Sequence, residues 1–143
     1  NINGDGSFQM TAQEMAVASV YNLPVKIVLI NNGCLGMVRQ WQEIIIPGGK
    51  YKGVFLEGSP DFVKLAEAYG LLGLRATKRE EVRPTLEKLL AHPGPAMADM
   101  VVSIEENCYP MVPGGSNLNE VVERDPSPQQ EIKVDASHHL SVS

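Results

Sequence analysis

The sequence contains only two cysteines, Cys34 and Cys108, in 143 residues. Two thiols do not indicate a disulfide scaffold, and a reducing compartment fits at least as well as an oxidising one. We interpret both side chains as plain thiols rather than as catalysts.

The sequence also lacks long apolar runs and clusters of positive charge. No apolar run approaches the roughly 20 residues that a membrane-spanning helix needs. The 17 acidic and 12 basic residues give a formal charge of −5, and the basic residues are scattered. Binding to a membrane or to nucleic acid is therefore not expected, and the length suits one soluble domain with a tail.

The chain has no initiator methionine and no signal peptide. Residues 1–6 read like the end of a strand that enters a loop, so we expect an N-terminally truncated fragment.

Apolar periods of helical and strand type alternate along the chain. Helices are predicted to begin near residues 11, 35, 60 and 77, and strands are predicted over 25–30, 71–76 and 96–104. Two capping boxes are expected, Thr11 with Glu14 and Thr77 with Glu80, and Pro84 is expected to start or kink the last helix. The alternation predicts an α/β fold, a partial parallel sheet flanked by helices, with its ligand beyond the carboxyl ends of the strands.

The helix predicted over 35–45 carries one apolar stripe. Its members are Leu35, Val38, Trp41, Ile44 and Ile45. Arg39 and Gln40 lie on the other side and are predicted to be surface residues.

The composition predicts three parts. Residues 1–107 form the α/β domain, 108–125 an arm, and 126–143 a polar, disordered tail. The paired His138 and His139 in the tail lack the further ligands of a metal site.

A Gly-Asp-Gly-Ser run stands where the first strand meets a loop, at Gly4, Asp5, Gly6 and Ser7. Backbone N–H groups there can face an anion while Asp5 offers a carboxylate. Taken alone, these letters are common in ordinary turns.

A second polar pair, Asn31 and Asn32, follows Gly6 after 24 residues, at the end of the next predicted strand. Neighbouring parallel strands end at the same edge of a sheet, so Asp5 and Asn32 can offer two oxygens to one hard cation. Mg²⁺ suits a carboxylate, an amide oxygen, a carbonyl and phosphate oxygens.

Gly-Asp-Gly, a gap of this length and Asn-Asn resemble the signature of thiamine-diphosphate enzymes. NLPVKIVLINNGCLGMVRQWQE, PDFVKLAEAYG and PMVPGG are similar to the catalytic subunit of acetolactate synthase, and the likeness covers residues 1 to about 122. The resemblance implies the diphosphate-binding fold, truncated at its N-terminus. The stretch 44–59 departs from the usual family wording, so the loop near the active site is expected to differ in shape.

The resemblance also implies roles for individual residues. Asp5, the Asn32 side chain and the main-chain oxygen of Cys34 would bind Mg²⁺, which holds the diphosphate. The residues expected beside the cofactor are Gly4, Gly6, Ser7, Gly33, Gly36 and Met37.

Met37 and Trp41 lie one helical turn apart, so they share a face. Such a pair usually packs in a core. Because the family places this segment at the substrate entrance, we expect both to line the acceptor pocket, where Trp41 helps to choose between pyruvate and 2-ketobutyrate.

For the whole enzyme, the resemblance implies decarboxylation of pyruvate and its condensation with a second 2-keto acid, in branched-chain amino-acid biosynthesis. The catalytic glutamate is expected in a missing N-terminal domain of a partner subunit, and FAD in a missing middle domain. The resemblance implies a homodimer or tetramer, to which a small regulatory subunit can be added. It also implies a cytoplasmic location, or an organellar one if the source is a plant or fungus. The isolated fragment is expected to show little or no turnover.

Two alternatives remain open. One is another thiamine-diphosphate-dependent 2-keto-acid decarboxylase or oxidase. The other is a calcium-binding loop, because Asn1, Asn3, Asp5 and Gly6 mimic the start of an EF-hand, although Ala12 stands where that loop needs a glutamate.

Overall fold

The computed structural model describes residues 1–46, 50–112 and 114–123. The chain divides into two compact units, residues 1–107 and 108–143. The tail predicted to be disordered, 126–143, lies outside the described residues.

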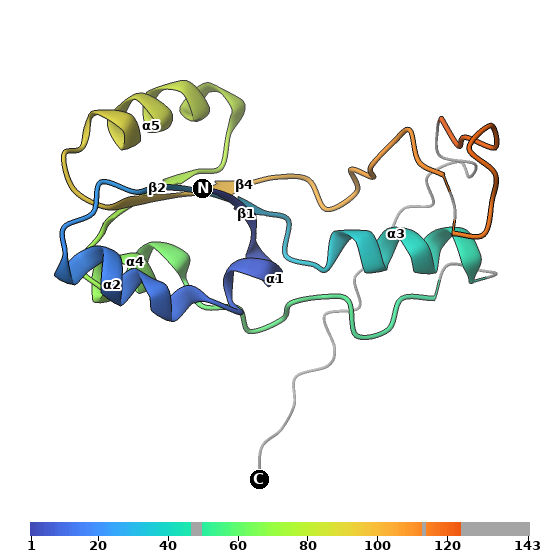
Figure 1. The fold of residues 1–143 in the computed structure, drawn as a ribbon, viewed down its shortest axis with the longest axis horizontal. Helices are drawn as coiled ribbons and strands as arrows, with labels where there is room; N and C mark the ends of the chain where they lie inside the picture. The colour runs from blue at the N-terminus through green and yellow to red at the C-terminus, as the bar shows by residue number, and fades with distance from the viewer. Residues whose placement is uncertain (47–49, 113, 124–143) are drawn as a thin grey trace, which may run out of the picture. The chain divides into compact units, whose positions relative to one another are not determined.

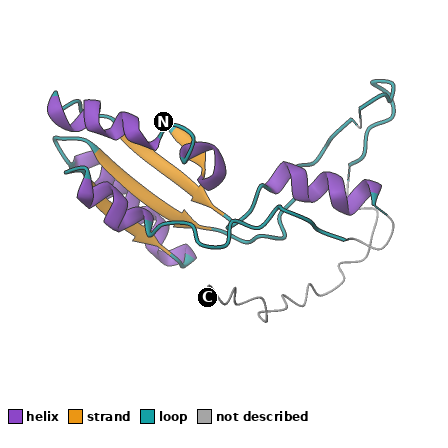
Figure 2. Ribbon diagram, turned by 90° about the horizontal axis from the view of Figure 1, so that it is seen from below, coloured by secondary structure: helices purple, strands orange, loops and turns teal. Residues whose placement is uncertain are grey.

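Four parallel strands of the first unit form one sheet (Figure 2). They are β1 (Ile2–Gly4), β2 (Lys26–Asn31), β3 (Leu72–Ala76) and β4 (Ala96–Val101), in the order β1-β2-β4-β3. Gly4 lies opposite Ile30, and Asp99 lies opposite both Leu29 and Arg75. The predicted fold class, a parallel sheet flanked by helices, is confirmed.

Helices cover both faces of this sheet (Figure 1). The helices α1 (Asp5–Phe8), α2 (Met15–Val20) and α4 (Phe62–Ala68) lie on one face, and α5 (Arg79–Ala91) lies on the other. A short 3₁₀ turn, Ala12–Glu14, leads into α2.

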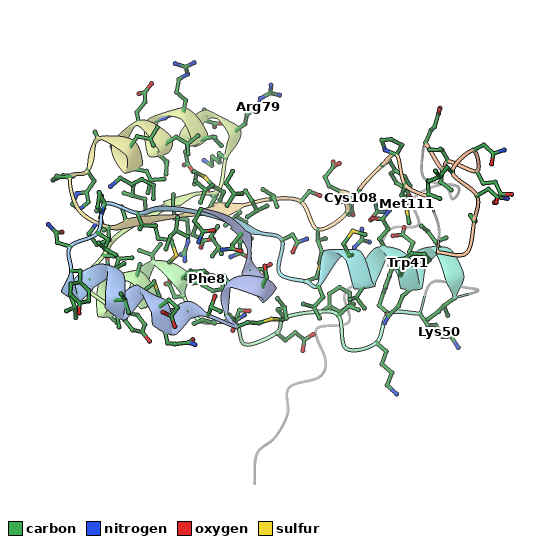
Figure 3. All side chains as sticks on the ribbon, viewed as in Figure 1. Phe8, Trp41, Lys50, Arg79, Cys108 and Met111 are labelled. Atoms are coloured by element: carbon green, nitrogen blue, oxygen red, sulfur yellow. The ribbon has the colours of Figure 1, made fainter. Side chains whose placement is uncertain are left out.

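The sheet separates two apolar clusters, because alternate side chains of a strand point to opposite faces. On β4, Met97 belongs to the α4 side, whereas Ala98 and Met100 belong to the α5 side. On the α4 side the rings of Phe8 and Phe62 meet edge to face with centroids 6.1 Å apart, which holds α1 against α4. Figure 3 labels Phe8 on this side of the sheet.

The helix α3 (Gly36–Ile45) continues beyond the carboxyl end of the sheet instead of covering it (Figure 1). The prediction that Arg39 and Gln40 lie on the surface is wrong, since each is 1% exposed. Val38, a member of the predicted apolar stripe, is 45% exposed. Away from the sheet, this helix buries polar side chains that bond to neighbouring chain segments and leaves part of its apolar stripe open.

Three predicted helix starts are corrected. Thr11 makes no capping hydrogen bond, because the chain there forms a 3₁₀ turn. The helix α4 is capped by Asp61, whose carboxylate accepts from the N–H groups of Val63 and Lys64. The first turn of α5 is closed by Glu81 rather than Glu80, because Glu81 reaches back to the N–H groups of residues 77 and 78.

Pro84 lies inside α5, which begins five residues earlier, at Arg79.

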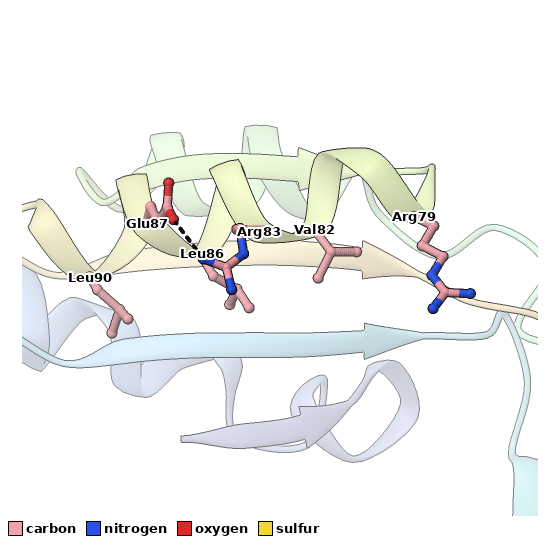
Figure 4. A pocket seen from close by; sticks show the side chains of 6 residues that line it. All are labelled: Arg79, Val82, Arg83, Leu86, Glu87 and Leu90. Atoms are coloured by element: carbon pink, nitrogen blue, oxygen red, sulfur yellow. Dashed lines mark ion pairs between the residues drawn. The ribbon is translucent and has the colours of Figure 1, made fainter.

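One flank of α5 borders a groove of about 470 Å³ whose apolar lining residues point toward the sheet (Figure 4). Its lining residues are Arg79, Val82, Arg83, Leu86, Glu87 and Leu90. None of the predicted site residues lines this groove. None of the helices in the described ranges has the length and apolar character of a membrane-spanning segment.

Candidate metal and cofactor site

The two polar loops predicted to meet are joined by a hydrogen bond. The backbone N–H of Gly33 donates to Oδ2 of Asp5 over 2.9 Å. Asp5 directly follows β1 and Gly33 lies just after β2, and these strands are parallel neighbours. Strand pairing therefore brings together two loops that are 28 residues apart in the chain.

Asp5 is a buried carboxylate, 2% exposed, at the start of the single turn α1. Burial raises the pKa of Asp5, and the hydrogen bond from Gly33 counteracts this in part; the charge of Asp99 raises the pKa slightly further. Asp5 takes part in none of the ion pairs between described residues. A cation beside Asp5 would offset the cost of burying its charge.

A short antiparallel contact holds the second loop. Cys34 bridges to Phe55, with the N–H of Leu35 donating to Val54 over 2.8 Å and the N–H of Leu56 donating to Gly33 over 2.9 Å. In an antiparallel pair, successive residues of one strand point their N–H and C=O groups alternately toward the partner strand and away from it. Here Gly33 and Leu35, the two neighbours of Cys34, make the hydrogen bonds to the partner segment. The N–H and C=O of Cys34 therefore point away from residues 54–56.

The N–H of Cys34 donates to the Oδ1 of Asn32 over 3.1 Å. The carbonyl oxygen of Cys34 points to the same side as this N–H, and it accepts no hydrogen bond from the described backbone. The Asn32 carboxamide and the Cys34 carbonyl, two of the three predicted ligand groups, thus lie on one side of the loop. The Cys34 thiol is buried, and burial raises its pKa.

Different structural features require glycine at different positions of the site. A Cβ on Gly36 would lie 3.0 Å from Nδ2 of Asn32, and a Cβ on Gly6 would lie 2.7 Å from a methyl carbon of Leu35. Gly33 has a φ of +69°, the left-handed region that favours glycine. Gly4 shows no such crowding, and the exposed Ser7 hydroxyl donates to its carbonyl over 3.2 Å.

Gly36→Ala is expected to weaken divalent-metal binding several-fold, because the added methyl group would push the Asn32 carboxamide aside by a few tenths of an ångström. The measurement is a titration with Mn²⁺ followed by electron paramagnetic resonance, in the presence of thiamine diphosphate. Val20→Ala is the control, since Val20 is an exposed side chain of α2 outside the proposed site. Equal metal affinity in Gly36→Ala and the wild type would contradict the placement of Asn32 as a ligand.

Met37 and Trp41 lie on α3, away from both core clusters. Met37 is 49% exposed and Trp41 is half-buried. Trp41 lies on the outlying helix in Figure 3. Packing in the core, the ordinary interpretation of such a pair, is therefore not what the structure shows.

Two buried polar groups near the loops were not predicted as site residues. Arg39 is a buried residue of α3, and its guanidinium contacts Glu43 and Asn107. Asp99 lies on β4, 1% exposed, and contacts Asn31 and Arg75. An acid inside the otherwise apolar strand Ala96–Val101 is the sequence signal that could have identified Asp99.

The donor set has the chemistry of a hard-cation site: a buried carboxylate without a counter-charge, and an amide oxygen and a carbonyl oxygen on one side of the loop that is hydrogen-bonded to it. Within the described ranges no cluster of three or more His, Cys, Asp or Glu side chains could hold a metal ion. Any metal here would thus need carbonyl, amide or phosphate oxygens. The calcium-loop alternative is wrong, because residues 2–4 form a strand paired with β2.

The chain resembles proteins of known function over most of its length. An acetolactate synthase large subunit of Pyropia yezoensis is 48% identical over 122 residues, which are 84% of this chain and 20% of that protein. The acetolactate synthase isozyme 2 large subunit of Escherichia coli K12 is 39% identical over 123 residues, 86% of this chain and 22% of that protein. The chain thus spans about a fifth of the length of these relatives.

A solved structure shares the fold. The thiamine diphosphate-dependent 4-hydroxybenzoylformate decarboxylase of Rhodococcus jostii RHA1 superimposes with a TM-score of 0.65 at 30% identity, over 71% of this chain and 19% of that one. The family model for the C-terminal TPP-binding domain of thiamine pyrophosphate enzymes matches residues 1–100. Because the matched residues include both loop tips, the chain belongs to the thiamine pyrophosphate enzymes, through their C-terminal TPP-binding domain.

Proposed function

We propose that this chain is the diphosphate-binding part of an acetolactate synthase catalytic subunit. The hydrogen bond between Gly33 and Asp5 carries the proposal, because it joins the two halves of the cofactor motif across neighbouring strands. The acetolactate synthase relatives, 39% to 48% identical, support the choice of reaction.

Mg²⁺ is proposed to bind the Asp5 carboxylate, the Asn32 amide oxygen and the Cys34 carbonyl oxygen. The buried charge of Asp5 and the common side of the other two groups support this set. Gly4, Gly6 and Ser7 would lie beside the diphosphate, where the small residues leave the backbone N–H groups accessible.

When bound, thiamine diphosphate supplies the carbanion chemistry that removes CO₂ from a 2-keto acid and joins the remainder to a second one. This chain would anchor the diphosphate end and shape the acceptor side. Met37 and Trp41 are proposed to form the apolar wall that distinguishes pyruvate from 2-ketobutyrate. The exposure of Met37 supports this role, because a side chain buried in the core could not meet substrate.

Product analysis tests the reaction. The full natural protein that carries these residues is incubated with pyruvate, Mg²⁺ and thiamine diphosphate, and acetolactate is the expected product. Acetaldehyde or acetyl phosphate without acetolactate would instead identify a decarboxylase or an oxidase. That second candidate is favoured by one observation, the likeness to a solved decarboxylase.

The assembly and the compartment are further proposals that rest on the family resemblance described above. They are a homodimer or tetramer, FAD bound outside these residues, a small regulatory subunit and a cytoplasmic or organellar location. The 2-keto-acid substrates are small molecules, so the domain needs no macromolecular substrate surface.

A further inference from the structure

A chain of hydrogen bonds crosses the sheet from its β3 edge to the metal loop. Arg75 on β3 donates through Nε to Oδ2 of Asp99, over 3.0 Å. Asn31, the last residue of β2, donates through Nδ2 to Oδ1 of Asp99, also over 3.0 Å. Both carboxylate oxygens of Asp99 are thereby engaged from opposite neighbouring strands.

This series of hydrogen bonds continues from Asn31 into the loop that carries Asn32. The N–H of Gly33 is shared between Oδ1 of Asn31, at 3.2 Å, and Oδ2 of Asp5, at 2.9 Å. A carboxylate only accepts hydrogen bonds, whereas a carboxamide has one donating and one accepting end. Asp99 therefore forces the NH₂ group of Asn31 toward itself, and the oxygen of Asn31 must face Gly33.

Packing alone does not explain an acid at position 99. Its side chain is 1% exposed, and its neighbours along β4 are Ala98 and Met100. A buried carboxylate is costly unless it is paired, and an apolar residue of similar volume would pack at no such cost. Arg75 provides the pairing, and Asp61, the cap of α4, accepts a hydrogen bond from Arg75 over 2.5 Å and holds it in place.

We propose that Arg75 and Asp99 are positioning residues for the metal site. Through Asn31 they orient the N–H of Gly33, and through Gly33 they hold Asp5 in the geometry that receives Mg²⁺. The inference rests on the proposed function, because it assumes that Asp5 is a metal ligand. It adds three residues, Arg75, Asp99 and Asn31, that touch neither metal nor cofactor.

The test measures metal binding directly in the full natural protein. Arg75→Met and Asp99→Asn are titrated with Mn²⁺ in the presence of thiamine diphosphate and followed by electron paramagnetic resonance. Each variant is expected to bind Mn²⁺ about tenfold more weakly, the usual loss when a residue that orients a ligand is removed. The double variant is expected to bind Mn²⁺ no more weakly than either single variant, since both substitutions interrupt the same series of hydrogen bonds.

Three further measurements separate positioning from simple stability. Arg75→Lys, which keeps the positive charge, is expected to recover part of the affinity. Turnover of the variants at saturating Mg²⁺ is expected to stay within about twofold of the wild type, because these hydrogen bonds affect the affinity for the metal and not the reaction that follows. Arg83→Met, which removes an arginine 88% exposed, is the matched control and should bind Mn²⁺ normally.

The outcomes are distinct. Wild-type Mn²⁺ affinity in both variants, with only a lowered melting temperature, would overturn the inference and leave the proposed function standing. Failure of the wild type itself to bind Mn²⁺ with thiamine diphosphate would overturn the proposed function, and the inference with it. Should Asp99→Asn not fold, Arg75→Met still decides, because the Arg75 side chain is 38% exposed and its removal leaves no large cavity.

Discussion

Asp5→Asn is expected to abolish Mg²⁺-dependent binding of thiamine diphosphate while the protein stays folded. The asparagine keeps an oxygen that can accept from Gly33 but loses the only charge in the proposed ligand set. Calorimetric titration of thiamine diphosphate in the presence of Mg²⁺ measures the effect. Retained cofactor binding within tenfold of the wild type would remove Asp5 from the metal site.

The same variant has a pH signature in the absence of metal. Burial raises the pKa of Asp5 above its ordinary value of 3.8, so the folded protein holds this proton more tightly than the unfolded chain does. The wild type therefore loses stability relative to Asp5→Asn as the pH rises from about 3.8 through the higher folded pKa.

Melting temperatures of both proteins, measured without metal at a series of pH values, should show this divergence. Adding Mg²⁺ should raise only the wild-type value, because the ion binds the ionised carboxylate. Glu14→Gln, which neutralises an exposed acid, is the control and should follow the wild type.

Arg39→Met is expected to destabilise the protein by about 3 kcal/mol, the typical cost of breaking a buried ion pair from one side. Arg39 donates to Glu43 over 3.1 Å, to the carbonyl of Glu105 over 3.2 Å and to the side chain of Asn107 over 2.5 Å. Its guanidinium carbon also lies 5.9 Å from the centre of the Tyr51 ring. Removing the Arg39 guanidinium would break the hydrogen bonds between α3 and the segment that follows β4.

Urea denaturation of the full natural protein measures the loss of unfolding free energy. Arg83→Met is a matched control, because Arg83 and Glu87 form the same i,i+4 pair on an exposed helix surface and should contribute under about 1 kcal/mol. The double variant Arg39→Met, Glu43→Leu is expected to recover part of the loss, since no unpaired buried charge remains. Equal stability of Arg39→Met and Arg83→Met would show that the buried cluster holds nothing together.

The sequence alone was sufficient for the fold class and for the meeting of the two loops. Strand and helix periods are local properties, and a turn after each of two parallel strands must lie at the same sheet edge. Asp5 and Asn32 could therefore be placed at one edge before any coordinates.

The tertiary structure alone decided which polar side chains are buried and which of them meet. Arg39 and Gln40 looked like surface residues because their helix was expected to turn its apolar stripe inward against a sheet, whereas α3 continues beyond the sheet (Figure 1). Asp99 meets Arg75 and Asn31 from positions 24 and 68 residues away in the chain. Those contacts depend on the strand order β1-β2-β4-β3, which a local period does not encode, because hydrogen bonds across a sheet form between whichever strands long-range packing makes neighbours.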